Sequence, residues 1–284
     1  MIWIRAMGTG RLHKLAAFTN SPDGGNPAGV WIGEKLPNPG TMQSIAAEVG
    51  FSETAFVKPT NGKHRVVRYF SPEIEVPFCG HATIATGVLL GETESDGTYI
   101  LKTAVGDVPV SVRVRKGVRE ALLTSVEPQY VLAEEGLIDE ALSILGWRRH
   151  DLDPSIHPAK AYAGAWHLVL AVELADRLAE LEYDFEILKT VMLREDLTTL
   201  QLVWRESVGM FHSRNPFPVG GVFEDPATVA AAAALGGYLR AANLIEVPTL
   251  INIRQGEAMG RPSRIIVQIP TSGGIVVSGT AVRI

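Results

Sequence analysis

The chain of 284 residues contains a single cysteine, Cys79, so it cannot form an intramolecular disulfide. It has no apolar run long enough to cross a bilayer, because the alanine-rich run 227–235 is short and Arg240 soon follows. Its first residues lack the apolar stretch and small-residue cleavage site of a secretory signal. A net charge of −5 leaves no excess of basic groups for phosphates. We therefore expect a cytoplasmic protein with no nucleic-acid partner and no membrane contact.

Motifs for the common cofactors are also missing. The segment "GTGRLH" lacks the third glycine of a dinucleotide-binding turn, and no phosphate-binding loop with Gly-Lys-Ser/Thr occurs. Neither the nucleophile elbow Gly-x-Ser-x-Gly nor a His-Glu-x-x-His zinc helix is present, and the seven histidines show no zinc-ligand spacing. We expect no metal and no cofactor. Two kinds of function remain open: cofactor-independent acid/base chemistry on a small anion, and simple binding of an anion.

The composition is that of an ordinary globular protein, with 46% hydrophobic and 20% charged residues. The length suits two lobes better than one core. The pattern places an N-terminal lobe at 1–117 and a C-terminal lobe at 118–284, with residues 1–10 as a leader or scar. The last strand, 275–284, is a candidate to return to the first lobe.

The first lobe alternates short strands with few helices. Residues 11–18 have the alternation of a strand, and the glycine-rich "TNSPDGGNPAG" that follows indicates a long loop. "NPGTMQSIAAEVG" has helical spacing of apolar residues, and Gly50 suits a left-handed C-terminal cap. Further strands precede an apolar helix at 81–91.

The second half repeats this order and ends on strands after an apolar helix predicted at 226–240. The stretches "VRYFSPEIEVPFCGHATIATGVLL" and "GMFHSRNPFPVGGVFEDPATVAAAAALGGYL" each contain a β-like segment, a Pro/Gly-rich turn and a small-residue helix. This parallel predicts two similar α+β lobes related by a pseudo-twofold axis, with a cleft between them.

The start of each apolar helix is a candidate anion site, because its unpaired N–H groups and partial positive charge attract a carboxylate. At the first, Gly80 allows close approach of the backbone, and His81 and Thr83 can add hydrogen bonds. At the second, Asp225 followed by Pro226 has the form of an ordinary helix start, with aspartate as the cap.

Cys79 and Glu53 are ambiguous on pattern alone. A lone cysteine before a small-residue helix is typically a small core residue, although a helix N-terminus can also activate a thiol. Glu53, between a helix end and a strand in "FSETAFV", occupies a place where a carboxylate normally faces solvent.

Several longer stretches resemble the phenazine-biosynthesis PhzF-like family, which shares the diaminopimelate-epimerase fold. They are "AFTNSPDGGNPAGV", "MQSIAAEVGFSETAFV", "RYFSPEIEVPFCGHATIATG", "AYAGAWHLVLAV", "GVFEDPATVAAAAALGGYL" and "QGEAMGRPSRIIV", and they stand in the family's order from about residue 11 onward. The resemblance implies two lobes, each a curved mixed sheet wrapped around a central helix, with the active site between them. A homodimer is also an expectation for this fold.

The resemblance also implies an activity: isomerisation of a dihydro-hydroxyanthranilic acid, in which a glutamate moves a proton between carbons without metal or cofactor. Matched motifs assign catalysis to Glu53, His81 and Asp225. The matched motifs also include Gly80, which we expect to bind a small carboxylated substrate together with Asn26, Thr83 and Thr228. The substrate itself stays open.

Two alternatives remain. Epimerases of this fold use two opposed cysteines; here the first matches Cys79 and the second matches Thr228, which leaves an epimerase, racemase or dehydratase reaction open. The family usually has Gly-Ser where this chain has Val229 and Ala230. The branched valine and the lost hydroxyl also leave open a non-catalytic scaffold that binds a small anion or a partner.

Overall fold

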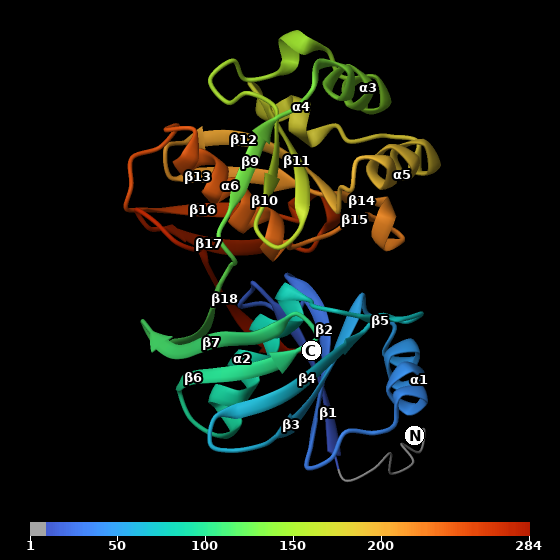
Figure 1. The fold of residues 1–284 in the computed structure, drawn as a ribbon, viewed down its shortest axis with the longest axis vertical. Coiled ribbons are helices and arrows are strands. Elements are labelled where there is room, and N and C mark those ends of the chain that lie inside the picture. Colours follow the sequence, from blue (N-terminus) through green and yellow to red (C-terminus); the bar gives the residue numbers. More distant parts are fainter. Residues whose placement is uncertain (1–9) are drawn as a thin grey trace. The chain divides into compact units, whose positions relative to one another are not determined.

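The computed structural model describes residues 10–284, so residues 1–9 of the expected leader lie outside the described part (Figure 1). Contacts divide the chain into two compact units. Unit 1 runs to Leu123 and also contains Ser278–Ile284, while unit 2 is Thr124–Val277. The sequence pattern places the division near residue 117. Within residues 10–284, no helix is long and apolar enough to span a membrane.

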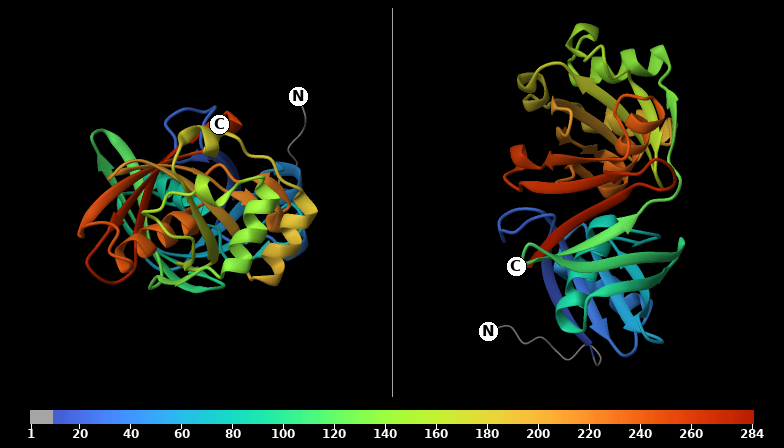
Figure 2. Two further views of the ribbon diagram at one scale, coloured as in Figure 1. Left: turned by 90° about the horizontal axis from the view of Figure 1, so that it is seen from above. Right: turned by 90° about the vertical axis from the view of Figure 1, so that its left-hand side faces the viewer.

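Unit 1 is rich in β-structure. Its strands follow the order β18-β1-β2-β3-β4-β6-β7-β8, and β8 also neighbours β18. The C-terminal strand β18 pairs with β1 in antiparallel register, where Leu15 faces Arg283; the red strand meets the blue one in Figure 2. The strands are β1 (Gly10–Ala17), β2 (Asn26–Gly33), β3 (Glu53–Pro59), β4 (His64–Phe70), β5 (Glu75–Val76), β6 (Gly97–Thr103), β7 (Gly106–Arg115), β8 (Val118–Thr124) and β18 (Val276–Arg283).

The described residues of unit 1 form two helices. Helix α1 (Pro39–Val49) begins where the Asn38 side chain accepts a bond from the Thr41 N–H, and it ends at Gly50, whose φ of 71° is left-handed. That end is the predicted one. Helix α2 (Gly80–Thr93) is buried from His81 to Gly91 and packs against β1, β2, β3 and β7. It is therefore the central helix of this unit.

Gly87 illustrates how tightly the strands enclose α2. A Cβ at this position would lie 2.8 Å from Val110 and 2.9 Å from the Ala121 Cβ. We expect Gly87→Ala to destabilise the protein by about 1–3 kcal/mol, because overpacking outweighs the gain in helix propensity. Gly136→Ala in helix α3 (Glu135–Leu145) is the matched control, since a Cβ there meets nothing within 4 Å. Urea unfolding of both variants tests this expectation. Equal free energies of unfolding in Gly87→Ala and Gly136→Ala would contradict it.

The main strands of unit 2 follow the order β17-β16-β13-β12-β11-β10-β9. Helix α6 (Val229–Ala241) is buried along most of its length and packs against β9, β10 and β17. Leu168 and Leu170 of β11 join a separate cluster with the helices α3, α4 and α5. The strands are β9 (Gln129–Leu132), β10 (Ala159–Tyr162), β11 (Trp166–Val172), β12 (Thr199–Ser207), β13 (Met210–Arg214), β14 (Pro216–Phe217), β15 (Val222–Glu224), β16 (Thr249–Gln255) and β17 (Ser263–Ile269). The other helices are α3 (Glu135–Leu145), α4 (Ala175–Ala179) and α5 (Phe185–Arg194).

The structure corrects two expectations. The predicted start of the second apolar helix at 226 is wrong: α6 begins at Val229, and its N-cap is Thr228. The Asp225 N–H bonds to the Asn215 carbonyl at 3.0 Å, so Asp225 closes the hairpin before the helix. The predicted loop is also shorter, because β2 already begins at Asn26 and pairs with β1 there. The expectation of a mixed, sheet-rich fold with few helices is confirmed.

Candidate active site

Glu53 is the first residue of β3 and lies next to the end of α1. The left-handed turn at Gly50 ends the helix, and Phe51 and Ser52 lead directly into the strand. In the parallel pairing of β2 with β3, Glu53 is opposite Ala28. Its side chain is 17% exposed, so the carboxylate is mostly buried but keeps some contact with solvent.

Cys79 and His81 lie at the start of α2, where Cys79 is the N-cap residue. Both are nearly buried, with exposed fractions of 7% and 6%. The Thr83 hydroxyl donates to the Cys79 carbonyl at 2.7 Å and lies 2.7 Å from the Tyr69 hydroxyl. The chain of contacts from β4 through Thr83 thus fixes the first turn of α2.

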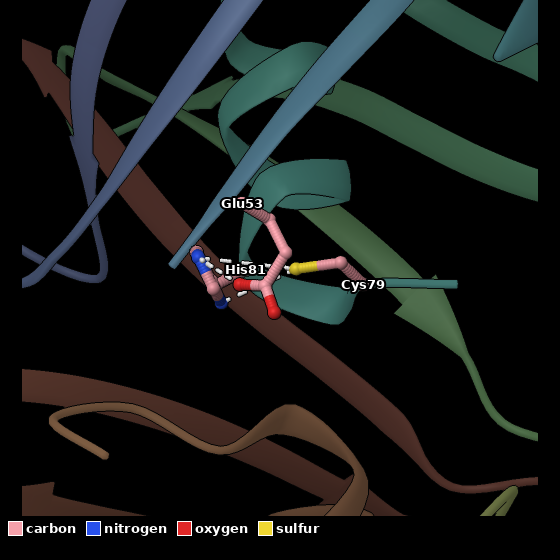
Figure 3. A group of neighbouring side chains, drawn as sticks. All are labelled: Glu53, Cys79 and His81. Carbon is pink, nitrogen blue, oxygen red and sulfur yellow. Dashed lines mark hydrogen bonds and ion pairs between the residues drawn. The ribbon is translucent and has the colours of Figure 1, made fainter. Parts of the chain in front are cut away.

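The three side chains converge in one cluster, which we call the Glu53 cluster (Glu53, Cys79 and His81; Figure 3). His81 Nε2 lies 3.4 Å from Glu53 Oε2, and Cys79 Sγ lies 3.4 Å from His81 Nδ1. The imidazole therefore stands between a carboxylate and a thiol. Such an arrangement can accept, hold and return a proton.

Tyr69 contacts the Glu53 cluster indirectly, through the Thr83 hydroxyl that bonds to the Cys79 carbonyl. Burial raises the pKa of this phenol, so it stays neutral and can hydrogen-bond to Thr83. We expect Tyr69→Phe to lower the free energy of unfolding by about 1 kcal/mol, the usual value of one hydrogen bond. Tyr99→Phe is a control with the same change in a buried tyrosine of the same unit, whose hydroxyl bonds to carbonyls away from the cluster. If only Tyr69→Phe alters the reactivity of Cys79 toward alkylating agents, its specific support of α2 is established; identical reactivity in both variants would contradict it.

Ser52 is a member of the site that sequence reasoning missed. Its hydroxyl lies 3.4 Å from His81 Nε2, on the same side as the Glu53 carboxylate. Its position in the sequence could have identified it, because Ser52 directly precedes Glu53 in the quoted "SETAFV" motif. A hydroxyl in this place can pass a proton to or from the imidazole.

The same cluster is also a set of potential metal ligands. Within residues 10–284, the ligand atoms of Glu53, Cys79 and His81 all lie within 4.8 Å of one another. A metal site was not expected from the sequence, because these residues do not have the spacing of a zinc motif. Folding brings together ligands from the start of β3 and the start of α2.

Asp225 and Thr228 form a second cluster, in unit 2, together with Gln255. The Thr228 hydroxyl donates to Asp225 Oδ2 at 2.6 Å. The Gln255 amide donates to the Asp225 carbonyl at 2.7 Å and accepts from the Thr228 N–H at 3.2 Å. Gln255 is buried and was not predicted as a site residue, although it opens the quoted "QGEAMGRPSRIIV" stretch.

The other predicted substrate-binding residues occupy different environments. Gly80 is the first helical residue of α2, directly beside the cluster. Asn26 is buried at the start of β2, two positions before the partner of Glu53 in the sheet. Thr83 is fully buried with its hydroxyl occupied by Cys79 and Tyr69, so its contacts give no support to a role in substrate binding.

The two departures from the family pattern lie in the first turn of α6. Val229 is the first helical residue and is buried, and Ala230 is partly buried. The nearby Thr228 hydroxyl is already bonded to the Asp225 carboxylate and to the Gln255 amide. A thiol mechanism that needs Thr228 as its second acid/base group would have to break these bonds first.

Comparison with known proteins gives a consistent result. The family model described as phenazine biosynthesis-like protein matches residues 15–284. A trans-2,3-dihydro-3-hydroxyanthranilate isomerase of Pseudomonas fluorescens is 32% identical over 255 residues, which cover 88% of this chain and 86% of that protein. An uncharacterized isomerase of Mesorhizobium japonicum is 31% identical, with 94% of each chain covered.

Solved structures agree in fold. The crystal structure of a Bacillus anthracis phenazine biosynthesis protein of the PhzF family superposes with a TM-score of 0.85 at 25% identity, covering 96% of each chain. A hydroxyproline epimerase from Agrobacterium vitis has a TM-score of 0.63 at 14% identity and shares the fold alone.

Proposed function

Because the chain belongs to the phenazine biosynthesis-like protein family, we propose that it is an isomerase that moves a proton between carbon atoms of a small carboxylated substrate. The observation that carries this proposal is the Glu53 cluster, in which a mostly buried carboxylate lies 3.4 Å from an imidazole. The name of the Pseudomonas fluorescens relative supports a cyclic, unsaturated amino or hydroxy acid as the substrate class.

Glu53 is the group we propose to carry the proton. The carboxylate takes a proton from one carbon of the substrate and, as the double bonds shift, returns it to another carbon of the same molecule. No net charge or redox equivalent leaves the enzyme, so the reaction requires no external acceptor. His81 orients the carboxylate and can hydrogen-bond to the amino or hydroxyl substituent.

The substrate carboxylate has a suitable partner at the start of α2. The first N–H groups of a helix are unpaired and carry a partial positive charge. Gly80 keeps this end of the helix free of a side chain, which permits close approach of an anion. On this proposal, the carboxylate is fixed at Gly80 and the reacting carbons lie at Glu53.

The roles of Asp225 and Thr228 in the reaction and in substrate binding stay predictions from the sequence. In the structure, the Thr228 hydroxyl donates to the Asp225 carboxylate, and the Gln255 amide donates to the Asp225 main-chain carbonyl. The roles of Asn26 and Thr83 in substrate binding, a homodimer and a cytoplasmic location stay predictions from the sequence.

A thiol mechanism is the second candidate, because Cys79 Sγ lies 3.4 Å from His81 Nδ1. An imidazole at this distance can take the thiol proton and leave a reactive thiolate. This candidate predicts that alkylation of Cys79 abolishes turnover and that substrate protects the thiol. The isomerase proposal predicts that Cys79→Ser keeps most of the activity.

The proposal is tested by incubating the protein with trans-2,3-dihydro-3-hydroxyanthranilate and with a panel of unsaturated amino and hydroxy acids, followed by NMR. Formation of a double-bond isomer of one acid supports it. Thermal stabilisation by these acids without any turnover would contradict it and favour an anion-binding scaffold instead.

A further inference from the structure

The Glu53 cluster has the composition of a zinc site with an open position. It offers a thiolate sulfur, an imidazole nitrogen and a carboxylate oxygen, which are the three ligand types that zinc takes in proteins. Three protein ligands leave one position of a tetrahedron for water or another small ligand.

The distance between the imidazole and the carboxylate fits this geometry. With zinc–ligand bonds of about 2.0–2.3 Å at tetrahedral angles, bound nitrogen and oxygen atoms lie about 3.4 Å apart, and bound sulfur and nitrogen about 3.6 Å apart. His81 Nε2 lies 3.4 Å from Glu53 Oε2 and 3.8 Å from Cys79 Sγ. The sulfur also lies 3.4 Å from His81 Nδ1, nearer than to Nε2, so zinc at Nε2 requires a rotation of the Cys79 or the His81 side chain.

The charge of the cluster and its partial exposure to solvent also favour binding of a cation. Carboxylate and thiolate together supply two negative charges, which neutralise a divalent ion. Cys79 and His81 are nearly buried, while the Glu53 side chain is 17% exposed, so the cluster keeps some contact with solvent at Glu53. A bound ion is therefore shielded from competing water on most sides.

We propose that the Glu53 cluster binds one Zn²⁺ ion reversibly through Glu53 Oε2, Cys79 Sγ and His81 Nε2, and that this ion blocks the site. The thiol gives its proton to solvent as the zinc–sulfur bond forms. The blocking effect rests on the proposed function, because zinc occupies the Glu53 carboxylate that would accept the substrate proton. Binding itself does not depend on that function.

Calorimetric titration of the metal-free protein with ZnCl₂, in the absence of substrate, tests the site directly. The expected result is one Zn²⁺ per chain, with at least a tenfold weaker affinity in Cys79→Ser, because losing a direct ligand exceeds the roughly 10–100-fold effects of losing an outer-shell partner. Circular dichroism verifies that the conservative variant is folded.

His212→Gln is the control for adventitious surface binding. His212 lies 2.8 Å from Glu206 and 3.2 Å from Glu257, so it forms a second group of histidine and carboxylates, but without a cysteine. This variant is expected to bind Zn²⁺ as the wild type does. Loss of binding in His212→Gln, equal binding in Cys79→Ser, or no binding by the wild type would each overturn the proposal.

Co²⁺ gives an independent readout of the sulfur ligand. The Co²⁺-loaded wild type is expected to show a thiolate-to-metal charge-transfer band that Cys79→Ser lacks, and a wild-type spectrum without this band would overturn the proposal. Because neither measurement uses a substrate, failure of the isomerase proposal would leave the zinc result unaffected. Absence of zinc binding would likewise leave the isomerase proposal standing.

Discussion

Replacing Glu53 with glutamine is expected to lower kcat by about 100- to 10,000-fold, the usual contribution of a general acid/base. Glutamine has nearly the same size as glutamate and can still accept a hydrogen bond from His81, so the site keeps its shape. It cannot accept a proton from carbon. KM should change little if the substrate carboxylate binds at the start of α2 and not at Glu53.

Steady-state kinetics of Glu53→Gln and of a control variant, Glu73→Gln, checks this expectation. Glu73 is an exposed glutamate of unit 1, in the turn between β4 and β5, and its replacement should leave kcat unchanged. A Glu53→Gln variant with more than about one tenth of the wild-type kcat would be incompatible with a general acid/base worth at least 100-fold.

Buried His167 is expected to make stability strongly dependent on pH. It is fully buried, with Nδ1 2.8 Å from the Thr199 hydroxyl, and burial lowers its pKa from 6.5 to about 3. Below pH 6.5, His167 therefore binds a proton in the unfolded chain, whereas in the native protein it stays neutral down to about pH 3. The stabilising effect is complete above pH 6.5 and falls by about 1.4 kcal/mol per pH unit down to the native pKa.

Urea unfolding of the wild type and of His167→Gln at several pH values between 4 and 7 measures this contribution. Most of this range lies between the native and the unfolded pKa of His167. The expected result is a pH slope about 1.4 kcal/mol per unit shallower in the variant, whatever its absolute stability. Exposed His64 is the control, and His64→Gln should keep the wild-type slope. Equal slopes in all three proteins would mean that His167 titrates normally in the native state.

Local signals in the sequence were sufficient for many elements and for the family. Gly50 ends α1 as predicted, and the strand pattern "HRVVRYF" coincides with β4. The predicted family is confirmed by the match over residues 15–284, and the predicted isomerase class by the names of the relatives. Regular hydrophobic periodicity and turn residues are local properties, so they can be read without knowing the fold.

Features that depend on contacts between distant segments could not be predicted in the same way. Asp225 followed by Pro226 has all the local properties of a helix start, yet a bond to Asn215 holds it in a hairpin and moves the start to Val229. Ser52 and Gln255 join their clusters through neighbours about 27–29 positions away in the chain. Their roles follow from tertiary structure, because polar residues of these types are common in turns and strand ends.

The grouping of Glu53 with His81 and Cys79 was only partly predictable from the sequence. Each residue had an ordinary structural interpretation by itself, and the family motifs named Glu53 and His81 together. The short separations within this cluster come only from the packing of β3 against α2.

Deuterium incorporation is the most direct test of proton transfer by Glu53. The wild type, Glu53→Gln and Cys79→Ser are incubated in deuterated water with the acid that the protein isomerises, and the carbon positions of substrate and product are examined by NMR and mass spectrometry. Deuterium at carbon with the wild type and Cys79→Ser, but not with Glu53→Gln, is the predicted result. Incorporation that persists in Glu53→Gln and disappears in Cys79→Ser would contradict the account and assign the proton transfer to the thiol.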